Sequence, residues 1–531
     1  METSQLQSVM KHRNMLEGIL VGVLMVVFGS LLLSNIRDAA PAPEHDEYLV
    51  LMSSIIYSNG ISPTTKGMWS QLESDQKAFP LAPRLANASY QFFGPDIFSR
   101  RKLIILLKTL SLAPLYIVLR SFVSPVSALI VLAFYAFCSL HIASSVVLHD
   151  RGFSIFFASF AIGFLALIRP NIHKLRLAIF ALLAGLCSSA TLATYNLSYV
   201  FPIFMFFLLI WKLRECDLPR NPRLFVIGAY LLPLVVTFSS SFKVFREQFA
   251  SRNYALTYSV LGHGWNPFEI VGIMASNFLQ SLKLLFVGLS WSASDGMAAH
   301  PGTLVGSLFA LLAAFGLVTC FKNRKSLPYV AFFVLQFLTY QIFMGLWRPR
   351  MWLVTLIGIV FVAGVGIENA LAFVDRQRRL VVPARIILAI FLVWHGISGW
   401  NMFTKHTAKT AFYKPEFVEL YSVAASLEAA PPKRTAVLFG SPILADAFFA
   451  TRTYAQLTHP GSNVAQVATL KRTDLQIFDE KEFSEEKLAA YDKLLVFEEN
   501  GIPAHELLTK NRYVQTACSW TRFRCFVKNP G

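Results

Sequence analysis

The residues best able to do chemistry in this sequence are charged side chains that lie in polar segments between long apolar runs. The stretch Pro41–Tyr48 contains two adjacent carboxylates, Asp46 and Glu47. Later polar segments supply cations and one further acid, at Arg84, Arg100, Arg101, His149, Asp150, Arg151, Arg348 and Arg350. A carboxylate can take a proton from an attacking group, and arginine binds phosphate in bidentate geometry. The set therefore suits attack on a phosphate-bearing substrate, provided that the fold brings these segments together.

The composition indicates where such a fold would lie. Of the 531 residues, 55% are hydrophobic and 15% are charged, and the mean hydropathy is +0.51. Soluble domains are usually about 45–50% apolar and about 25% charged. The chain is therefore expected to be an integral membrane protein.

The net charge of +17 arises from basic residues that mostly fall in short turns between apolar runs. The positive-inside rule predicts this distribution, so we expect membrane lipids rather than nucleic acid as partners. The first apolar run follows Lys11 and Arg13 and has no small-residue cleavage site after it, which is typical of an uncleaved anchor. We expect a multi-pass protein of the cytoplasmic (inner) membrane, with the N-terminus inside and the C-terminus outside.

About eleven apolar runs approach the roughly 20 residues that a helix needs to cross a bilayer. They are Leu16–Leu33, Leu103–Leu119, Val126–Val147, Phe153–Leu167, Leu177–Thr194, Tyr199–Trp211, Leu224–Phe238, Leu304–Phe321, Val330–Leu346, Trp352–Leu371 and Ile386–Trp400. A further run, Ile270–Leu289, carries Asn277, Gln280, Ser281 and Lys283 on one helical face. If it spanned, the basic turns at 322–325 and 376–379 would both lie outside, so we place it at the outer surface or in a cavity wall.

The sequence divides into a transmembrane domain and a smaller terminal domain. Residues 1–402 form the first, with a large outer loop at 36–101, and residues 403–531 form the second. In the second domain, short β-rich runs at 435–439, 493–497, 513–518 and 523–528 alternate with helical ones, which is typical of a small α/β domain. Cys518 and Cys525 flank a hairpin-like segment, and either a disulfide or two buried thiols fits their spacing.

In this topology all the candidate residues lie on the outer side of the membrane. A sugar carried on a lipid phosphate needs cations to neutralise the departing phosphate and a carboxylate to activate the attacking group. Asp46 is the stronger base candidate, because a helix starting beside it would keep it ionised, and Glu47 is a helper. The alternatives stay open: Asp46 and Glu47 could cap that helix, and the arginines could reach lipid headgroups.

Three segments resemble motifs of the GT-C superfamily of polyprenyl-phosphate-sugar glycosyltransferases, which includes protein O-mannosyltransferases and lipid A aminoarabinose transferases. Asp46-Glu47-Tyr48 resembles the acidic motif of the first outer loop, and Pro83-Arg84 leads to Phe93-Gly94 and then Arg101 as in the family. Arg350-Met-Trp352 is placed like the family's late arginine segment. The resemblance implies a GT-C-like helical fold, Asp46 as the acceptor-activating base, and Arg84, Arg101 and Arg350 at phosphate or cavity contacts.

The resemblance further places His149, Asp150 and Arg151 where relatives keep an acidic or polar group. It implies an inverting transferase that moves a sugar from a polyprenyl-phosphate donor to a lipid, glycan or protein acceptor. No metal site and no cofactor is expected. Two alternatives remain, a lipid-linked-sugar flippase or transporter and a surface polysaccharide polymerase or ligase. A transporter would need ionisable residues within its spans, and Lys108 is the main one in this sequence.

Overall fold

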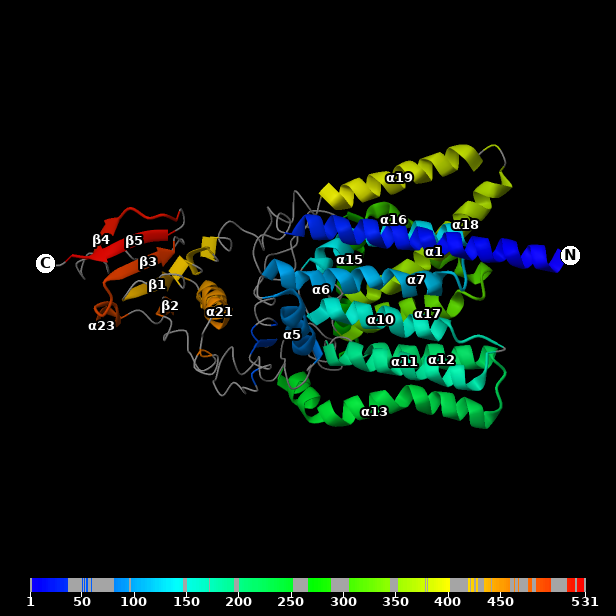
Figure 1. Cartoon of the computed structure of the whole chain (residues 1–531), viewed down its shortest axis with the longest axis horizontal. Helices are drawn as coiled ribbons and strands as arrows, with labels where there is room; N and C mark the ends of the chain where they lie inside the picture. The colour runs from blue at the N-terminus through cyan, green and yellow to red at the C-terminus, as the bar shows by residue number, and fades with distance from the viewer. Residues whose placement is uncertain are drawn as a thin grey trace. The chain divides into compact units, whose positions relative to one another are not determined.

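The chain forms a bundle of long helices and a separate small sheet (Figure 1). The computed structural model describes residues 2–36, 81–94, 97–146, 150–170, 172–194, 200–251, 266–287, 305–343, 352–377, 381–401, 434–440, 442–458, 476–479, 484–497, 513–520 and 523–529, with isolated positions elsewhere. Two compact units divide it: Met1–Ala40, Lys77–Ala82 and Phe92–Ala411 form the first, and Pro41–Gln76, Pro83–Gln91 and Phe412–Gly531 form the second. Each unit is described by itself.

Helices make up the described part of the first unit. They are α1 (Glu2–Ser34), α6 (Ile97–Leu110), α7 (Leu112–Leu119), α8 (Pro125–Ala136), α9 (Ser139–Ser145), α10 (Asp150–Ala166), α11 (Lys174–Thr194), α12 (Phe201–Glu215), α13 (Arg220–Ser251), α15 (Pro267–Leu282, continued by η3, Lys283–Val287), α16 (Ser307–Thr319, followed by η5, Cys320–Lys322), α17 (Leu327–Phe343), α18 (Trp352–Arg376) and α19 (Val381–Asn401).

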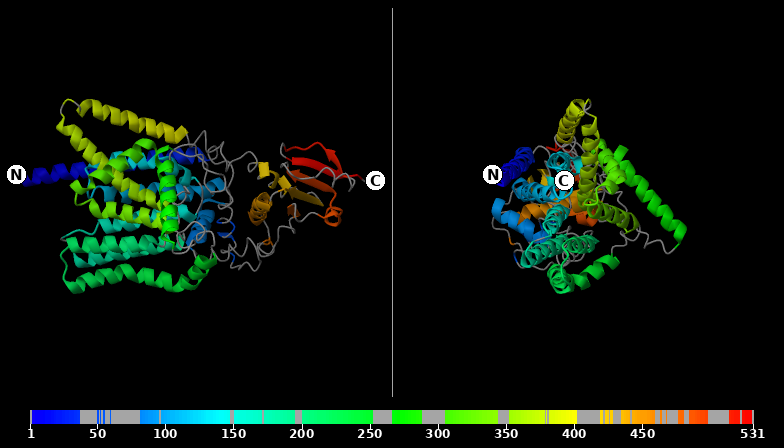
Figure 2. Two further views of the ribbon diagram at one scale, coloured as in Figure 1. Left: turned by 180° about the vertical axis from the view of Figure 1, so that it is seen from behind. Right: turned by 90° about the vertical axis from the view of Figure 1, so that its right-hand side faces the viewer.

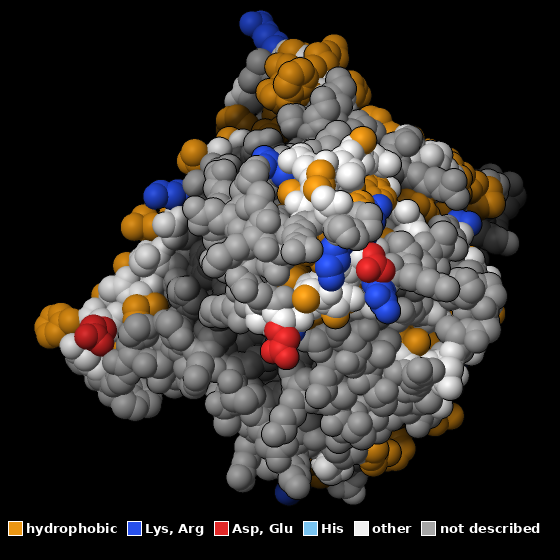
Figure 3. All heavy atoms as spheres, turned by 90° about the vertical axis from the view of Figure 1, so that its left-hand side faces the viewer, with side chains coloured by type: hydrophobic (Ala, Val, Ile, Leu, Met, Phe, Trp, Pro, Cys, Tyr) orange, Lys and Arg blue, Asp and Glu red, His pale blue; other side chains and the backbone are white. Residues whose placement is uncertain are grey.

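Several of these helices are long and apolar enough to cross a membrane. Within the described residues seven meet this criterion, and the pair α8 and α9, bent by 58°, makes an eighth if it is one span. Large apolar side chains are exposed along α1, α13 and α19, and hydrophobic side chains gather around the rim of the molecule in Figure 3. The expected polytopic helical membrane protein is confirmed, and the count of about eleven crossings stays a prediction from run length.

Three segments run side by side in the same direction: α6 with its continuation α7, α10 and α18. A Cβ added to Gly152 near the start of α10 would lie 2.8 Å from Ile104 of α6, and one added to Gly163 near its end would lie 2.6 Å from Pro114 of α7. Gly364 in the second half of α18 similarly meets Leu119 at the end of α7. Small residues of this kind let membrane helices approach closely. The first turns of α6, α10 and α18 consequently lie at one end of the unit.

Helix α1 runs in the opposite direction along α6 and α7. Gly29, near its end, faces Thr109 of α6, whereas Glu17, near the start of its apolar part, contacts residues at the end of α7. Helix α19 also runs opposite to α18, since Gly399 near its end packs on the carbonyl of Phe137 at the end of α8. Both α1 and α19 therefore finish at the end where α6, α10 and α18 begin. We call this the site end, and the opposite one the basic end.

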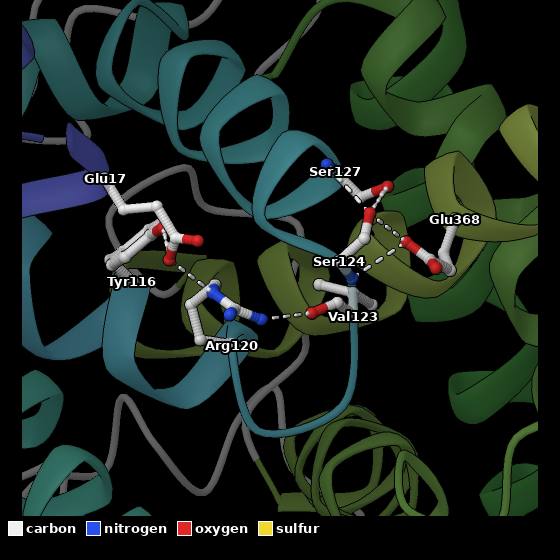
Figure 4. A network of polar contacts seen from close by, with 7 residues as sticks. All are labelled: Glu17, Tyr116, Arg120, Val123, Ser124, Ser127 and Glu368. Atoms are coloured by element: carbon white, nitrogen blue, oxygen red, sulfur yellow. Dashed lines mark hydrogen bonds and ion pairs between the residues drawn. The ribbon is translucent and has the colours of Figure 1, made fainter. Parts of the chain in front are cut away.

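A polar network closes the basic end and connects four helices (Figure 4). Glu17 of α1 accepts hydrogen bonds from Tyr116 Oη and Arg120 Nε, each at 2.9 Å, and Arg120 Nη1 donates to the Val123 carbonyl at 3.1 Å. Glu368 of α18 accepts from the backbone N–H and the Oγ of Ser124, at 2.9 and 2.7 Å. Polar groups within a membrane have to be satisfied by the protein itself. These contacts therefore hold the ends of α1, α7, α8 and α18 in register.

The basic turns expected inside lie at this basic end. Asn323 in the turn after α16 donates to the Phe122 carbonyl at 2.7 Å, and Lys212 near the end of α12 lies 5.6 Å from the Tyr329 ring centroid. Helix α18 ends at Arg376, about two turns after Glu368, so the turn that follows it also lies toward this end. The basic segments predicted to share one side of the membrane thus share one end of the bundle.

Helix α15 lies across the other helices of the first unit, as Figure 2 shows. Asn277 Nδ2 donates to the Gln341 carbonyl at 3.1 Å, and Gln341 Nε2 donates to Ser281 Oγ at 2.9 Å. Gln341 belongs to the last turn of α17, which begins at the basic end, so these bonds fix α15 at the site end. Its length and composition would permit a span, so its place at the outer surface stays a prediction from the charge distribution.

The described part of the second unit contains a five-stranded sheet in the order β2-β1-β3-β5-β4. Its strands are β1 (Thr435–Phe439), β2 (Ile477–Asp479), β3 (Lys493–Phe497), β4 (Tyr513–Thr516) and β5 (Phe523–Lys528), and two helices, α21 (Pro442–Thr458) and α23 (Glu485–Leu488), accompany them. β1 pairs in parallel with β2 and β3, whereas β5 is antiparallel to β3 and β4. The parallel strands are almost fully buried, which explains their continuous apolar sequence.

Two further features stabilise this sheet. Cys518 and Cys525 form a disulfide across the β4–β5 hairpin, which decides between the two alternatives that their spacing left open. The Oη of Tyr513 lies 2.6 Å from the carbonyl oxygens of Leu488 and Tyr491. Burial, followed by the nearby charge of Asp492, raises the pKa of Tyr513. Disulfides of this kind persist in oxidising compartments.

The ion pair between Glu17 and Arg120 yields a stability prediction. Replacing Glu17 by alanine removes the carboxylate that accepts hydrogen bonds from the Arg120 guanidinium and the Tyr116 hydroxyl. A hydrogen bond to a charged group is worth about 1.5–3 kcal/mol, so we expect the free energy of unfolding to fall by about 2–3 kcal/mol in SDS titrations of the detergent-purified protein. Glu269→Ala, at an exposed position of α15, is the control and should change it little. Equal stability of both variants would contradict the role given to Glu17.

Candidate functional site

Four segments converge on the site end of the first unit. The end of α1 and the starts of α6, α10 and α18 lie there, brought together by the glycine contacts described above. The chain segments that carry the predicted acids and cations leave or enter the bundle at these four points. The fold therefore gathers the ends of the predicted loops on one side, as the predicted topology requires.

Two consecutive arginines open the second membrane segment. Arg100 and Arg101 lie one turn into α6, and both side chains are fully buried. The Arg101 guanidinium carbon lies 5.6 Å from the centroid of the Phe98 ring, one turn earlier on the same helix. Cation–π contacts of this kind are stronger when the cation is removed from water. Buried ionisable residues are rare in membrane domains and often belong to functional sites, so both arginines are candidates for one.

Lys108 extends this positive charge into the bundle. It lies two turns after Arg101 on the same face of α6, which also carries Ile104. Its Nζ is fully buried and donates to Ser144 Oγ of α9 at 2.9 Å, and Ser144 Oγ donates in turn to the His141 carbonyl at 3.0 Å. The three cations on α6 thus form a line from its first turn toward the membrane interior.

His141 is a functional candidate that the sequence did not reveal. Its ring is fully buried and stacks between Phe28 of α1 and Tyr135 of α8, with centroid distances of 5.2 and 4.2 Å. Neither ring nitrogen has a hydrogen-bond partner among the described residues. The sequence placed His141 within one continuous apolar run. The missing signal is the break between α8 and α9, which contains neither glycine nor proline.

The starts of α10 and α6 lie against each other. Asp150 and Arg151 form the first turn of α10, and the next residue, Gly152, contacts Ile104 of α6. Arg101 is on the same face of α6 as Ile104, so the segment that carries Asp150 and Arg151 begins beside the turn that carries Arg101. The side chains of Asp150 and Arg151 lie outside the described part of the structure, so their role stays a prediction.

Arg84 belongs to α5 (Leu81–Phe93), a separate amphipathic helix. Ala82, Ala86 and Ser89 are buried on one face, whereas Arg84 is exposed on the other. The helix ends at Gly94, whose φ of 87° is a conformation that glycine adopts without steric cost. The glycine of the Phe93-Gly94 motif therefore terminates α5 before α6 begins.

The remaining predicted site residues lie outside the described residues. They are Asp46, Glu47, His149 and Arg350. Arg350 precedes the start of α18 by two positions, so its segment enters the bundle at the site end. Within the described part of the chain, no group of three His, Cys, Asp or Glu side chains could hold a metal ion. The role of these four residues stays a prediction from sequence.

Comparison with known proteins shows the fold. No family model matches the chain, and no curated protein matches it in sequence. ArnT from Cupriavidus metallidurans in the apo state matches with a TM-score of 0.58 at 12% identity, over 97% of this chain and 98% of that one. The same protein bound to undecaprenyl phosphate matches with a TM-score of 0.55 at 13% identity, over 97% and 99%.

A second solved protein also shares the architecture. An oligosaccharyltransferase from Archaeoglobus fulgidus in the apo form matches with a TM-score of 0.50 at 12% identity, over 96% of this chain and 74% of that one. Likeness at these identities shows a common fold. The GT-C-like fold expected from the three sequence motifs is therefore confirmed over nearly the whole chain.

The arrangement of helix ends predicts which positions face the outside. The background variant has its free cysteines replaced by alanine, at Cys138, Cys187, Cys216 and Cys320. Single cysteines are then introduced into it at Asp150, Asn401, Arg220 and Arg324. A membrane-impermeant maleimide should label the positions at Asp150 and Asn401 in intact cells, because they lie at the site end. The positions at Arg220 and Arg324, at the basic end, should react only after permeabilisation. The reverse pattern would mean that the site end faces the cytoplasm.

Proposed function

We propose that this protein is an inverting glycosyltransferase that moves a sugar from a polyprenyl-phosphate donor to an acceptor at the outer face of the membrane. The observation that carries the proposal is the likeness, over 97% of this chain, to a structure of ArnT bound to undecaprenyl phosphate. The buried arginines at the site end support it, because they provide the positive charge that a lipid phosphate requires.

The proposed reaction has simple requirements. The acceptor hydroxyl or amine attacks the anomeric carbon from the face opposite the phosphate, and a new glycosidic bond forms as the carbon–oxygen bond to phosphate breaks. The bonding electrons leave with the phosphate, so cations rather than an acid stabilise the departing group. Asp46 takes the proton of the acceptor as general base. Glu47 assists at the same loop, and one inversion of configuration follows from the single displacement.

Arg101 is the described cation best suited to the phosphate. Its guanidinium is fully buried at the outer start of α6, where low polarity strengthens its attraction to a phosphate. Arg84, Arg350, His149, Asp150 and Arg151 complete the proposed set of substrate contacts.

A transporter of lipid-linked sugars is the second candidate function, and one observation favours it. Lys108 and His141 are buried within membrane segments, and ionisable residues at such positions often line the path of a transported substrate. Release of free polyprenyl phosphate separates the two candidates, because a transferase generates it and a transporter does not. The acceptor and the sugar remain open among lipids, glycans and proteins.

The base assigned to Asp46 yields an activity prediction. The protein is reconstituted with a lipid extract of its native membranes, and the polyprenyl phosphate released is measured by mass spectrometry. General acid–base catalysis contributes about 10²–10⁴-fold, so Asp46→Asn should lower the rate by at least about 10². Glu44→Gln, in the same segment, is the matched control and should retain the wild-type rate.

Two outcomes would count against this assignment. Full activity of Asp46→Asn would remove Asp46 as the base even if the protein is a transferase. Absence of polyprenyl phosphate release from the wild type, with the lipid-linked sugar merely redistributed between leaflets, would favour the transporter.

The phosphate contacts yield a separate binding prediction. Purified protein is titrated with undecaprenyl phosphate, and binding is followed by native mass spectrometry. Loss of one charge-assisted hydrogen bond costs about 1.5–3 kcal/mol, so Arg101→Gln should weaken binding about 10- to 100-fold. Arg324→Gln, at the basic end, should bind as the wild type does. Because Arg101 is buried, a melting curve of each variant accompanies the titration, and unchanged affinity in a folded Arg101→Gln protein would contradict the assignment.

A further inference from the structure

A cavity of about 540 Å³ lies between α8, α18 and α19, at the basic end of the first unit. Apolar side chains of all three helices line its interior, among them Ile130, Ala372, Ala389 and Leu392. Its volume falls within the range of about 300–1,000 Å³ that small-molecule sites occupy. The cavity therefore has room for a substantial apolar group, and it lies away from the site end.

The cavity exists because α19 packs loosely on the bundle. Only 6% of the α19 span is buried inside the protein, and α18 and α19 diverge from the turn that joins them, as Figure 2 shows. The exposed face of α19 carries large apolar residues, such as Ile390 and Trp394. Lipid chains cover such a surface in a membrane protein, so the cavity is open to the hydrocarbon phase.

Charged groups surround one side of this cavity. Arg385 Nη2 and Asp375 Oδ1 form an ion pair at 3.1 Å, and their side chains are 63% and 53% exposed. Glu368 lies further in, where it accepts hydrogen bonds from Ser124. All four residues line the cavity. The rim thus offers one guanidinium and two carboxylates at the level where the apolar helices end.

We propose that the cavity binds one phospholipid whose zwitterionic headgroup contains a primary ammonium, of the phosphoethanolamine type. One acyl chain occupies the apolar interior, the phosphate pairs with Arg385, and the ammonium donates to Asp375 and to the remaining acceptor sites of Glu368. A carboxylate has about four lone-pair sites, so Glu368 can accept from an ammonium in addition to Ser124.

The charges of the rim select this headgroup over others. An anionic headgroup such as phosphoglycerol brings the same phosphate without a cation, so its negative charge beside Asp375 and Glu368 is not offset, which like-charge repulsion disfavours. A quaternary ammonium has no N–H to donate to these carboxylates. A polyprenyl phosphate lacks a cation for them altogether. The proposal is independent of the proposed transferase activity, because the cavity and the candidate site lie at opposite ends of the bundle.

The first experiment tests the occupant of the cavity. Full-length protein is stripped of lipid in detergent, given an equimolar mixture of phosphatidylethanolamine, phosphatidylglycerol and phosphatidylcholine, and analysed by native mass spectrometry. We expect one retained phosphatidylethanolamine per protein. Ala389→Trp, which fills the cavity, should lower its occupancy at least about tenfold, whereas Ile390→Trp, on the neighbouring exposed position, should not. Ala372→Leu fills the cavity from α18 and replaces Ala389→Trp if that variant fails to fold.

The second experiment tests the headgroup contacts. Asp375→Asn should abolish the preference for phosphatidylethanolamine over phosphatidylglycerol, and Arg385→Gln should weaken the retention of every phospholipid. Equal retention of the three lipids by the wild type, or preferential retention of phosphatidylglycerol or phosphatidylcholine, would overturn the headgroup assignment. Unchanged retention in both cavity-filling variants would overturn the site itself.

Discussion

The close contact of α6 and α7 with α10 and α18 is the constraint on which the rest of the structure depends. Glycines at 152, 163 and 364 bring these helices together where any larger side chain would overlap a neighbour. Small residues are the usual means by which membrane helices pack, since burial of apolar surface gives little advantage within lipid. Because the three segments run in the same direction, their first turns have to lie at one end. The candidate site is a consequence of this parallel packing.

Charged residues have different surroundings at the two ends of the bundle. At the basic end the charges are paired, since Glu17 binds Arg120 and Glu368 binds Ser124, and this pairing holds four helices in register. Toward the site end, Arg100, Arg101 and Lys108 are buried on one helix and bring positive charge into the membrane region. Buried cations are costly in a bilayer, and their concentration on α6 is the feature on which the proposed phosphate site rests.

Sequence reasoning predicted the features that depend on local pattern. Apolar run length predicted the helical membrane fold, and β-rich runs predicted β1 and β3 with the bounds that the structure has. The pairing of Glu17 with Arg120 could not be predicted, because it joins residues 103 positions apart. The sequence also did not predict the break between α8 and α9 or the short strand β2, because no glycine or proline marks their boundaries. Of the candidate site, Arg101 was expected from the family motif and its role stays a prediction, whereas His141 was not expected because its position depends on that break.

Photo-crosslinking with an undecaprenyl phosphate analogue, followed by peptide mapping, tests the central claim most directly. The claim is that the lipid phosphate binds at the site end, between the starts of α6, α10 and α18. An analogue with a photoreactive group next to its phosphate should therefore label peptides that contain residues 97–104, 150–155 and 350–356. Labelling concentrated on residues 120–126 or 323–327, at the basic end, would contradict the account.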